Sequence, residues 1–454
     1  MQAQAHRAQH LRRIFAGFEK RVKAVFDYAE EHPGATLAEL EREAWRLSRD
    51  SFSEVLQVMI ESDREAGERE CRCECGGRLR YKGEQSRSQE TLVGRVRWSR
   101  GYYVCVSCGR GRYPLDEALR VASGSFSECV QEGAARLAVE MPFGEAAQEY
   151  PALTGISISA REIARITEER GAVLEERTAR DRARLLAGQE PVDKSRRALV
   201  RQRSWAVALD AAKVRFKDGW HEVNAGAVFW VETATGSEGV GEQGRAGRAR
   251  AREQSYIAEV GSMEEAGARL YAEVIERGVD PGEESLVCLA DGAPGIWSQY
   301  ALHFPHRVEV LDWYHAMEHL WAAGNGVLGE GTQPAKLWVA AQEQLLWDGR
   351  VEEVIANLGA LAEAPGGEAA REQIHYFEVN TERMRYPHFR AEGYPIGSGV
   401  VESACKRVVG ARLKQAGMCW NKAGARAVLA LRTARLSNRW DQAWLATAAL
   451  PVAA

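Results

Sequence analysis

The sequence predicts a mixed α/β protein of several domains, because long helical patterns flank one stretch in which strands and helices alternate. The chain has 454 residues, which is more than one ordinary core holds and indicates two to four domains. Apolar residues recur at helical spacing over residues 1–70 and 116–200. Residues 71–115 contain clustered cysteines and an alternating, hairpin-like pattern, and residues 203–312 alternate strand-like and helical runs.

The composition is that of a globular protein, with 45% hydrophobic and 27% charged residues. No apolar run reaches the roughly 18 residues of a membrane span, and the N-terminal stretch has no apolar signal segment. An odd number of cysteines, 9, favours a reducing compartment and thiol or metal use. We therefore expect a cytoplasmic protein. The net charge of −4 does not by itself indicate a nucleic-acid partner, but the charge is unevenly distributed.

The N-terminal half is expected to be mainly helical. Residues 1–70 predict two helices separated by the break HPGAT, residues 32–36. Two short helical segments surround LTGIS within residues 143–170, a pattern typical of a helix-turn-helix. Its second helix is predicted to begin at Ser159, with Glu162 at the capping-box position.

Two cysteine knuckles predict a zinc ribbon over residues 71–115. They read Cys73-x-Cys75-Gly-Gly and, thirty residues after Cys75, Cys105-x-x-Cys108-Gly. Four thiolates suit tetrahedral Zn²⁺, and the glycines let backbone N–H groups approach sulfur. Cys71 could replace Cys73 as a ligand, and the alternative to zinc is a set of reduced structural thiols. The other cysteines are expected to be buried apolar residues: Cys129, Cys288, Cys405 and Cys419.

Three carboxylates occur at the expected ends of strands or near the start of a helix in the second half of the chain. Three strands, a helix, a strand, a helix and a strand, followed by a helical insertion, is the element order of a ribonuclease H-like core. Asp210 is expected to close the first strand, Asp291 closes the fourth, and Glu402 lies early in a later helix. A lone aspartate at a strand end is usually a cap or turn residue. Three carboxylates meeting at one sheet edge would hold two Mg²⁺ or Mn²⁺ ions about 4 Å apart.

The stretch LDWYHAMEHLW, residues 311–321, supports two interpretations. His315, Glu318 and His319 spell H-x-x-E-H, a signature of one class of zinc peptidases. That function needs a third ligand and a peptide cleft, and nothing downstream indicates either. Alternatively, Asp312 ends a strand and His315 lies one helical turn along, near the proposed metal edge. This interpretation is favoured and makes His319 structural. Whether Asp312 is only a helix N-cap, and what His315 does, stay open.

The C-terminal region is strongly basic. Residues 403–440 contain 9 lysines and arginines and no acidic residue, which would suit a phosphate backbone. The alternative is a solvated helix surface balanced by acids elsewhere in the fold. The candidate DNA-contacting residues are Lys406, Arg407, Arg412, Lys414 and Lys422.

Four separated blocks together resemble the DDE transposases of bacterial insertion sequences. They are ALDAAKVRFKDGWHEVNAGAVFW, LADGAPGIW, VEVLDWYHAMEHLW and YPIGSGVVESACKRVVGARLKQAGMCW. The sequence is most similar to the ISKra group, which is related to the Mutator-like superfamily, over roughly residues 70–445. The resemblance implies cleavage and strand transfer of terminal-inverted-repeat DNA with Mg²⁺. By position, Asp210, Asp291 and Glu402 match the three acids, and Asp312-x-x-His315 matches the family's (C/D)-x-x-H motif.

The predicted organisation is therefore a ribonuclease H-like catalytic core with an α-helical insertion, preceded by helical and helix-turn-helix segments and a zinc ribbon. The expected segments are a helical region (1–70), the ribbon (71–115), a helix-turn-helix region (116–200), the first part of the core (201–312), the insertion (313–390), and the second part of the core with basic helices (391–454).

The expected activity is two-metal phosphoryl transfer that cleaves element ends and joins them to target DNA. The expected cofactors are two Mg²⁺ or Mn²⁺ ions per active site and a structural Zn²⁺. The expected partners are double-stranded DNA and further copies of the chain, in a dimer or higher oligomer without a membrane, near the bacterial nucleoid. The alternatives are an inactive transposase-derived DNA-binding protein and a zinc metallopeptidase.

Overall fold

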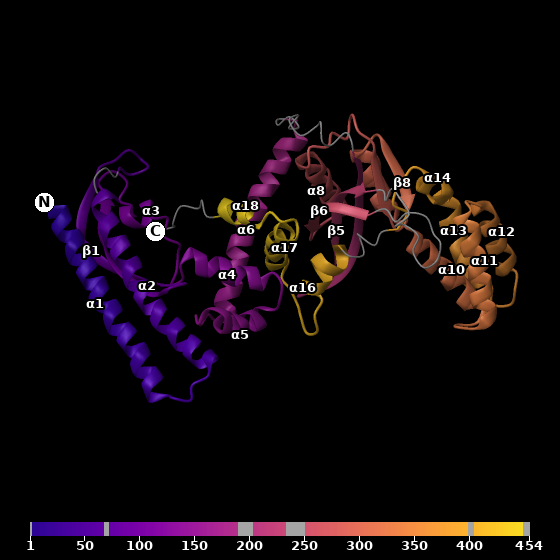
Figure 1. Ribbon diagram of the computed structural model, residues 1–454. Coiled ribbons are helices and arrows are strands. Elements are labelled where there is room, and N and C mark those ends of the chain that lie inside the picture. The colour runs from indigo at the N-terminus through magenta and orange to yellow at the C-terminus, as the bar shows by residue number, and fades with distance from the viewer. Residues whose placement is uncertain (1, 68–71, 189–202, 233–249, 398–403, 448–454) are drawn as a thin grey trace. The chain divides into compact units, whose positions relative to one another are not determined.

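The computed structural model describes residues 2–67, 72–188, 203–232, 250–397 and 404–447 (Figure 1). The fold is mixed α/β with two sheets, as the sequence predicts. The chain divides into two compact units, one formed by residues 1–167 and 445–454 and the other by residues 168–444. Within the described ranges, no helix is both long enough and apolar enough to cross a membrane.

The first unit begins with two long helices that form an antiparallel hairpin, α1 (Gln2–Glu31) and α2 (Leu37–Gly67). The predicted break over residues 32–36 is confirmed. Thr36 starts α2 by donating from its backbone N–H and its hydroxyl to the carboxylate of Glu39, at 2.7 and 2.8 Å. An ion pair of 3.0 Å between Arg21 and Glu54 joins the two helices.

A three-stranded antiparallel sheet follows, with strands β1 (Leu79–Thr91), β2 (Gly94–Cys105) and β3 (Gly111–Arg112) in that order. The predicted hairpin is confirmed. Val96 and Trp98 alternate inward on β2 and form a buried cluster with Leu115, against which Leu56 and Ile60 of α2 pack. The sheet and α2 therefore share one small core.

Four helices complete this part of the chain: α3 (Pro114–Ala118), α4 (Glu128–Ala138), α5 (Phe143–Thr154) and α6 (Ala160–Leu186). The two helices and the turn predicted around LTGIS are present. Gly155 ends α5 with a φ of 69°, a left-handed conformation that favours glycine. As predicted, Ser159 caps α6, because its hydroxyl accepts a hydrogen bond of 3.2 Å from the N–H of Glu162.

The second unit is built on a five-stranded sheet. Its strands are β4 (Ser204–Phe216), β5 (Gly219–Glu232), β6 (Arg250–Glu259), β7 (Leu286–Ala290) and β8 (Arg307–Leu311). The spatial order is β6-β5-β4-β7-β8. Strands β4, β5 and β6 are antiparallel neighbours, whereas β4, β7 and β8 run parallel.

The connections match the predicted order of strands and helices. Helix α8 (Met263–Glu276) links β6 to β7, and α9 (Pro294–His303) links β7 to β8. The region predicted to be helical after β8 contains α10 (Trp313–Leu328), α11 (Gln333–Trp347), α12 (Val351–Ala362), α13 (Glu368–Val379), η3 (Thr381–Met384) and α14 (Tyr386–Ala391). The chain then forms the π-helical turn η4 (Cys405–Gly410), α16 (Ala411–Leu413), α17 (Lys422–Leu436) and α18 (Trp440–Thr447).

One predicted boundary is wrong. Asp210 does not close its strand, because β4 continues to Phe216 and pairs with β5 as far as Gly219. The pairing with β5 keeps the backbone extended after the parallel neighbour β7 has ended. Asp210 therefore lies inside a strand, at the point where its parallel partner stops.

Candidate functional site

Asp210 and Asp291 occupy equivalent positions on adjacent parallel strands. The last register pair between β4 and β7 is Ala208 with Leu289, and each aspartate follows two residues later. Because neighbouring strands lie about 4.8 Å apart and every second side chain points to the same face, both carboxylates are placed side by side. The register places these two aspartates at neighbouring positions of one sheet edge.

Asp210 is partly buried and lies next to another acidic group. Burial raises the pKa of its carboxyl above the ordinary value, and the neighbouring negative charge of Asp291 raises it further. The backbone N–H of Ala211, at 2.6 Å, and the thiol of Cys405 donate hydrogen bonds that act in the opposite direction, as does the charge of His315. A carboxylate in such a setting gains from a bound cation.

Asp291 is fixed through its side chain and through its backbone. Its carboxylate accepts a hydrogen bond of 2.9 Å from the N–H of Ala293, and its backbone carbonyl accepts one of 2.7 Å from the hydroxyl of Tyr376 on α13. Gly292 has a φ of 108°, and a Cβ at this position would lie 2.6 Å from the Tyr376 ring. The helical insertion therefore reaches back to the residue that carries the second acid.

Sequence reasoning missed Tyr376. It lies 85 residues from Asp291, and no local pattern around it indicates a functional role. Its ring stacks on His319 with 3.6 Å between ring centroids, and His319 Nδ1 lies 2.5 Å from Oε1 of Gln373. The predicted structural role of His319 fits these contacts, because the histidine supports the tyrosine that holds Asp291.

Asp312 is the N-cap of α10. Its carboxylate accepts hydrogen bonds from the N–H groups of Tyr314, at 2.6 Å, and His315, at 3.1 Å, and the residue is completely buried. The register pairing of Ala290 with Leu311 places it next to Asp291 in the same row. Of the two roles left open for Asp312, the helix cap is the one seen, which makes it a residue that orients His315.

The H-x-x-E-H string does not assemble a metal site. His315 Nδ1 lies 3.2 Å from a carboxylate oxygen of Glu318, whereas His319 faces Gln373 and Tyr376. In the part of the chain that the structure describes, no group of three or more potential ligands includes these residues. The peptidase interpretation therefore has no geometric support.

Glu402, the predicted third acid, lies outside the described residues. Cys405, three residues later in the sequence, is the described residue of this segment that contacts Asp210. Among the described side chains, Asp210 and Asp291 do not gather a third ligand close enough to form a metal-binding group. Of the three predicted acids, Asp210 and Asp291 are therefore described as neighbours, and the position of Glu402 is not described.

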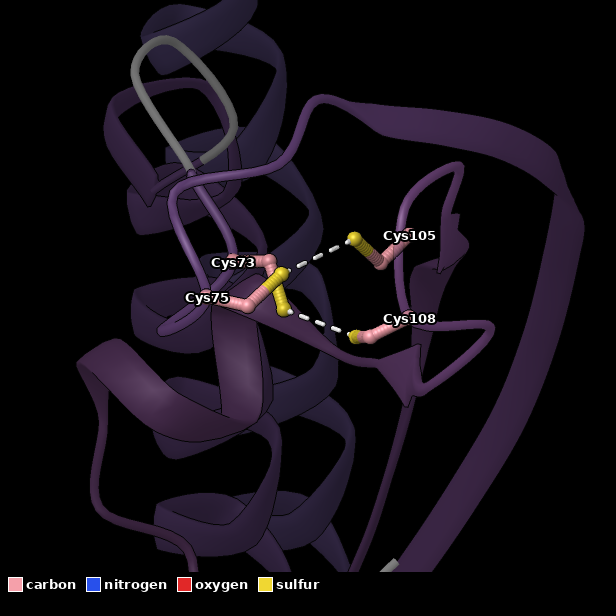
Figure 2. Close-up of side chains that lie close together, drawn as sticks. All are labelled: Cys73, Cys75, Cys105 and Cys108. Atoms are coloured by element: carbon pink, nitrogen blue, oxygen red, sulfur yellow. Dashed lines mark hydrogen bonds between the residues drawn. The ribbon is translucent and has the colours of Figure 1, made fainter.

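Four cysteines converge in the first unit. The sulfur atoms of Cys73, Cys75, Cys105 and Cys108 all lie within 4.8 Å of one another. The separations Cys73–Cys108 and Cys75–Cys105 are both 3.5 Å (Figure 2). A tetrahedral zinc with Zn–S bonds of 2.3 Å requires sulfur atoms roughly 3.8 Å apart. The cluster therefore fits Zn²⁺ closely.

Backbone geometry at the two knuckles explains why these thiols suit a metal. Backbone N–H groups of Cys108 and Ser107 point at the sulfur of Cys105 and lower the pKa of its thiol to about 6. A Cβ at Gly77 would lie 2.7 Å from that sulfur, so only glycine fits there. Thiolates are the form that binds zinc. The sequence left open whether Cys71 or Cys73 is the first ligand. Cys73 lies in the cluster, and Cys71 lies outside the described residues.

The remaining cysteines were expected to be buried, and for two of them this expectation is wrong. Cys129 and Cys419 are exposed, whereas Cys288 is buried and Cys405 is partly buried. Cys419 precedes Trp420, whose buried ring takes the inward position at this point. None of these four cysteines lies in the four-thiol cluster.

The basic region divides into exposed and internal residues. Lys406, Arg407, Lys414 and Lys422 are exposed. Arg412 is completely buried, with its guanidinium 4.8 Å from the centroid of the Trp420 ring, and burial lowers its pKa to about 10. The prediction that Arg412 contacts DNA is therefore wrong for this conformation, because its charge lies inside the core.

Several other basic residues are balanced by the fold itself. Lys422 pairs with Asp218 at 3.2 Å, and Arg439 pairs with Glu273 and with Glu276. At Lys422 and Arg439, the charge is therefore balanced by acidic residues of the fold, as the alternative to DNA contact predicted. Lys406, Arg407 and Lys414, in or just after η4, remain the exposed basic residues nearest in sequence to Glu402.

Comparison with known families gives a match over residues 31–193 to an uncharacterised protein family, UPF0236. The matched region contains α2, the cysteine cluster and the helices up to α6, and it ends before the sheet that carries the aspartates. No curated protein matches the chain.

Proposed function

We propose that the chain is a DDE-type DNA transposase of the ISKra group, which cleaves the ends of an insertion sequence and joins them to target DNA. The observation that carries the proposal is the shared register of Asp210 and Asp291 on adjacent parallel strands. Two like-charged, partly buried carboxylates at one sheet edge are expected where divalent cations bind. Glu402 would be the third ligand.

The sheet supports a ribonuclease H-like core. Three antiparallel strands, β4 to β6, are followed by two parallel strands that extend the sheet from β4. Helices α10 to α14 then separate β8 from η4, where a helical insertion is expected in this group. Tyr376 gives this insertion a role, because it attaches the inserted helices to the Asp291 edge.

The proposed chemistry is in-line phosphoryl transfer. Two Mg²⁺ or Mn²⁺ ions bound there would activate the attacking oxygen and neutralise charge on the leaving oxygen. In this proposal Asp210, Asp291 and Glu402 bind the ions at the sheet edge. Asp312 caps α10 and thereby keeps His315 near this edge. Water adds to the phosphorus and the bond to the 3′ oxygen breaks. The freed 3′ hydroxyl then attacks a phosphodiester of target DNA, displacing its 3′ oxygen.

Other parts of the chain are suited to hold DNA. The four cysteines form a zinc ribbon with a structural Zn²⁺ in this proposal, and α5 and α6 act as the helix-turn-helix that reads element ends through the major groove. Lys406, Arg407 and Lys414 are exposed and would contact phosphates. Joining two ends requires at least a dimer, acting in the bacterial cytoplasm at the nucleoid.

The test is incubation of the full-length protein with labelled terminal-repeat DNA and Mn²⁺ or Mg²⁺. Wild type should nick at a defined end, and Asp210→Asn, Asp291→Asn and Glu402→Gln should each abolish nicking while DNA binding is retained. Asp218→Asn is the matched control, because Asp218 is an exposed aspartate that pairs with Lys422. Retained nicking in any of the three variants removes that residue from the site. Binding without nicking by wild type would establish the inactive DNA-binding alternative.

A further inference from the structure

Cys405 contacts the carboxylate of Asp210, and the proposed reaction does not use it. Its thiol is hydrogen-bonded to the Asp210 side chain, and its sulfur accepts a hydrogen bond from the backbone N–H of Ala225. Ala225 is the register partner of Asp210 on the neighbouring strand β5, so both contacts belong to one strand pair. Cys405 therefore lies over the point of the sheet that carries the first proposed metal ligand.

In this contact the thiol is the donor, because an ionised carboxylate can only accept hydrogen bonds. A carboxylate has two oxygens with about four acceptor positions between them. The backbone N–H of Ala211, at 2.6 Å from Oδ1 of Asp210, occupies one position, and the Cys405 thiol occupies another. Two donors from different parts of the chain fix the rotation of the Asp210 side chain and leave its remaining acceptor positions for a cation.

The turn that carries Cys405 is packed against the sheet. η4 contacts both β4 and β5, and Val408 and Val409, about one turn after Cys405, are completely buried. The turn is π-helical, since the N–H of Ala411 donates to the carbonyl of Lys406, five residues earlier. Such turns are rare and occur frequently at functional sites. The side of η4 that carries Cys405 is therefore the side that faces the strands.

Arg432 on α17 attaches η4 to this helix. Its Nε donates to the backbone carbonyls of Arg407 and Val408, at 2.9 and 3.0 Å, and its Nη2 also donates to the Arg407 carbonyl. Arg432 is only 3% exposed, and hydrogen bonds from a charged donor are roughly twice as strong as neutral ones. A thiol is a weak donor, and this anchoring of η4 keeps the Cys405 thiol in place beside Asp210.

We propose that Cys405 is a positioning residue for the cation site, which holds the Asp210 carboxylate in the orientation that binds Mg²⁺ or Mn²⁺. The inference rests on the proposed two-metal function, because it requires that Asp210 binds a cation. Groups that hydrogen-bond a metal ligand typically contribute roughly ten- to a hundredfold to metal affinity. Mg²⁺ requires near-ideal octahedral geometry, whereas Ca²⁺ accepts irregular coordination. Loss of the thiol should therefore weaken Mg²⁺ binding more than Ca²⁺ binding.

The test measures Mn²⁺ binding to the full-length, zinc-loaded protein by electron paramagnetic resonance, with Mg²⁺ and Ca²⁺ as competitors. Cys405→Ser retains a donor and should bind Mn²⁺ nearly as well as wild type does. Cys405→Ala and Cys405→Val lack the donor and differ in size, and both should bind Mn²⁺ and Mg²⁺ roughly tenfold more weakly, with a smaller loss for Ca²⁺. Cys419→Val, at an exposed cysteine, is the matched control and should bind like wild type.

A second measurement tests the contact itself in the absence of these cations. The S–H stretching band of Cys405 is obtained as the infrared difference between proteins with and without the Cys405→Ser substitution. In an Asp210→Asn background this band should move to higher frequency, because a neutral amide accepts a weaker hydrogen bond than a carboxylate does. A band at the same frequency in both backgrounds would overturn the proposal, because the thiol would then not donate to Asp210.

The outcomes separate this inference from the proposed function. If wild type, Cys405→Ala and Cys405→Val bind Mn²⁺ equally well, the positioning role is overturned and the metal site stands. If Cys405→Val binds like wild type while Cys405→Ser is as weak as Cys405→Ala, the size of the side chain decides and the role of the donor is overturned. A wild-type protein that binds no Mn²⁺ at all would overturn the metal site, and this inference with it.

Discussion

The hydroxyl of Tyr376 donates a hydrogen bond of 2.7 Å to the backbone carbonyl of Asp291. This bond connects a helix of the insertion to the strand end that carries the second acid. Buried tyrosine hydroxyls normally have a partner, and here the partner belongs to a residue whose own side chain is a proposed metal ligand. Tyr376 is therefore interpreted as a positioning residue.

The first prediction concerns this bond. Tyr376→Phe should keep the ring and its stacking on His319 but release the Asp291 carbonyl, which costs about 1 kcal/mol. Cleavage should fall by about fivefold, and the Mg²⁺ concentration needed for half-maximal rate should rise. The shifted Mg²⁺ midpoint is the decisive measurement, because a general loss of stability would lower the amount of active protein without moving it. Tyr314→Phe, at an exposed position of α10, is the control and should behave like wild type.

The second prediction concerns the pH dependence of stability in the absence of Mg²⁺ and Mn²⁺. Burial raises the pKa of Asp210 above its ordinary value of 3.8, so the folded state holds this proton more tightly than the unfolded state does. The protonated form therefore favours folding at low pH. That contribution is lost as the pH rises through the raised pKa, which leaves a buried charge at neutral pH.

Without added Mg²⁺ or Mn²⁺, Asp210→Asn should consequently stabilise the zinc-loaded protein at pH 7, by on the order of 1 kcal/mol, and the gain should disappear as the pH falls towards 4. Thermal unfolding at several pH values measures this difference. Added Mg²⁺ should raise the unfolding temperature of wild type more than that of the variant. Equal stability of both proteins at every pH would show that the Asp210 carboxylate is not strained by burial.

The third prediction concerns the cysteine cluster. The purified protein should contain a single zinc ion per chain, and Cys105→Ser should lose it, because this thiolate is the one that backbone N–H groups favour most. Cys419→Ser, at an exposed cysteine outside the cluster, should retain the metal. Elemental analysis after dialysis distinguishes the two. Gly77→Ala should also reduce zinc content, because its Cβ would lie 2.7 Å from the sulfur of Cys105.

The fourth prediction concerns packing of α6 on α17 in the second unit. A Cβ at Gly171 would collide with the backbone carbonyl of Ala427, which cannot move aside without displacing its helix. Gly171→Ala should therefore destabilise the protein by about 2 kcal/mol or more. Gly359→Ala on α12 meets nothing within 4 Å and should stabilise it by about 0.5–1 kcal/mol. Urea unfolding of both variants provides the comparison, and a stabilising Gly171→Ala would contradict the close helix contact.

Much of the fold could be predicted because its signals are local. Short apolar runs marked β5 to β8, helical periodicity marked α1, α2 and α8, and the capping pattern marked the start of α6 at Ser159. The end of β4 could not be predicted, since continuation to Phe216 depends on pairing with β5. β5 begins at Gly219, so the two strands form a tight hairpin, and the exposed Lys213 and Arg215 interrupt the apolar run by which β4 was recognised.

The candidate site divides in the same way. The spacing of Cys73, Cys75, Cys105 and Cys108 was sufficient to predict the cluster, because two short knuckles on one hairpin can meet in few ways. The positions of Asp210 and Asp291 directly after apolar runs predicted that they share an edge, although Asp210 lies inside its strand. Arg412 was misassigned because a basic run does not show which charges face inward.

By itself, the sequence determined the order of helices and strands, the four-thiol cluster and the identity of the two aspartates at one edge, because each depends on residue type and short-range spacing. Only the tertiary structure decided that Tyr376 holds Asp291, that Asp312 caps α10 and that Arg412 is internal. These features depend on which surfaces meet across long separations in the chain, and burial and hydrogen bonding at such contacts are set by the packed fold as a whole.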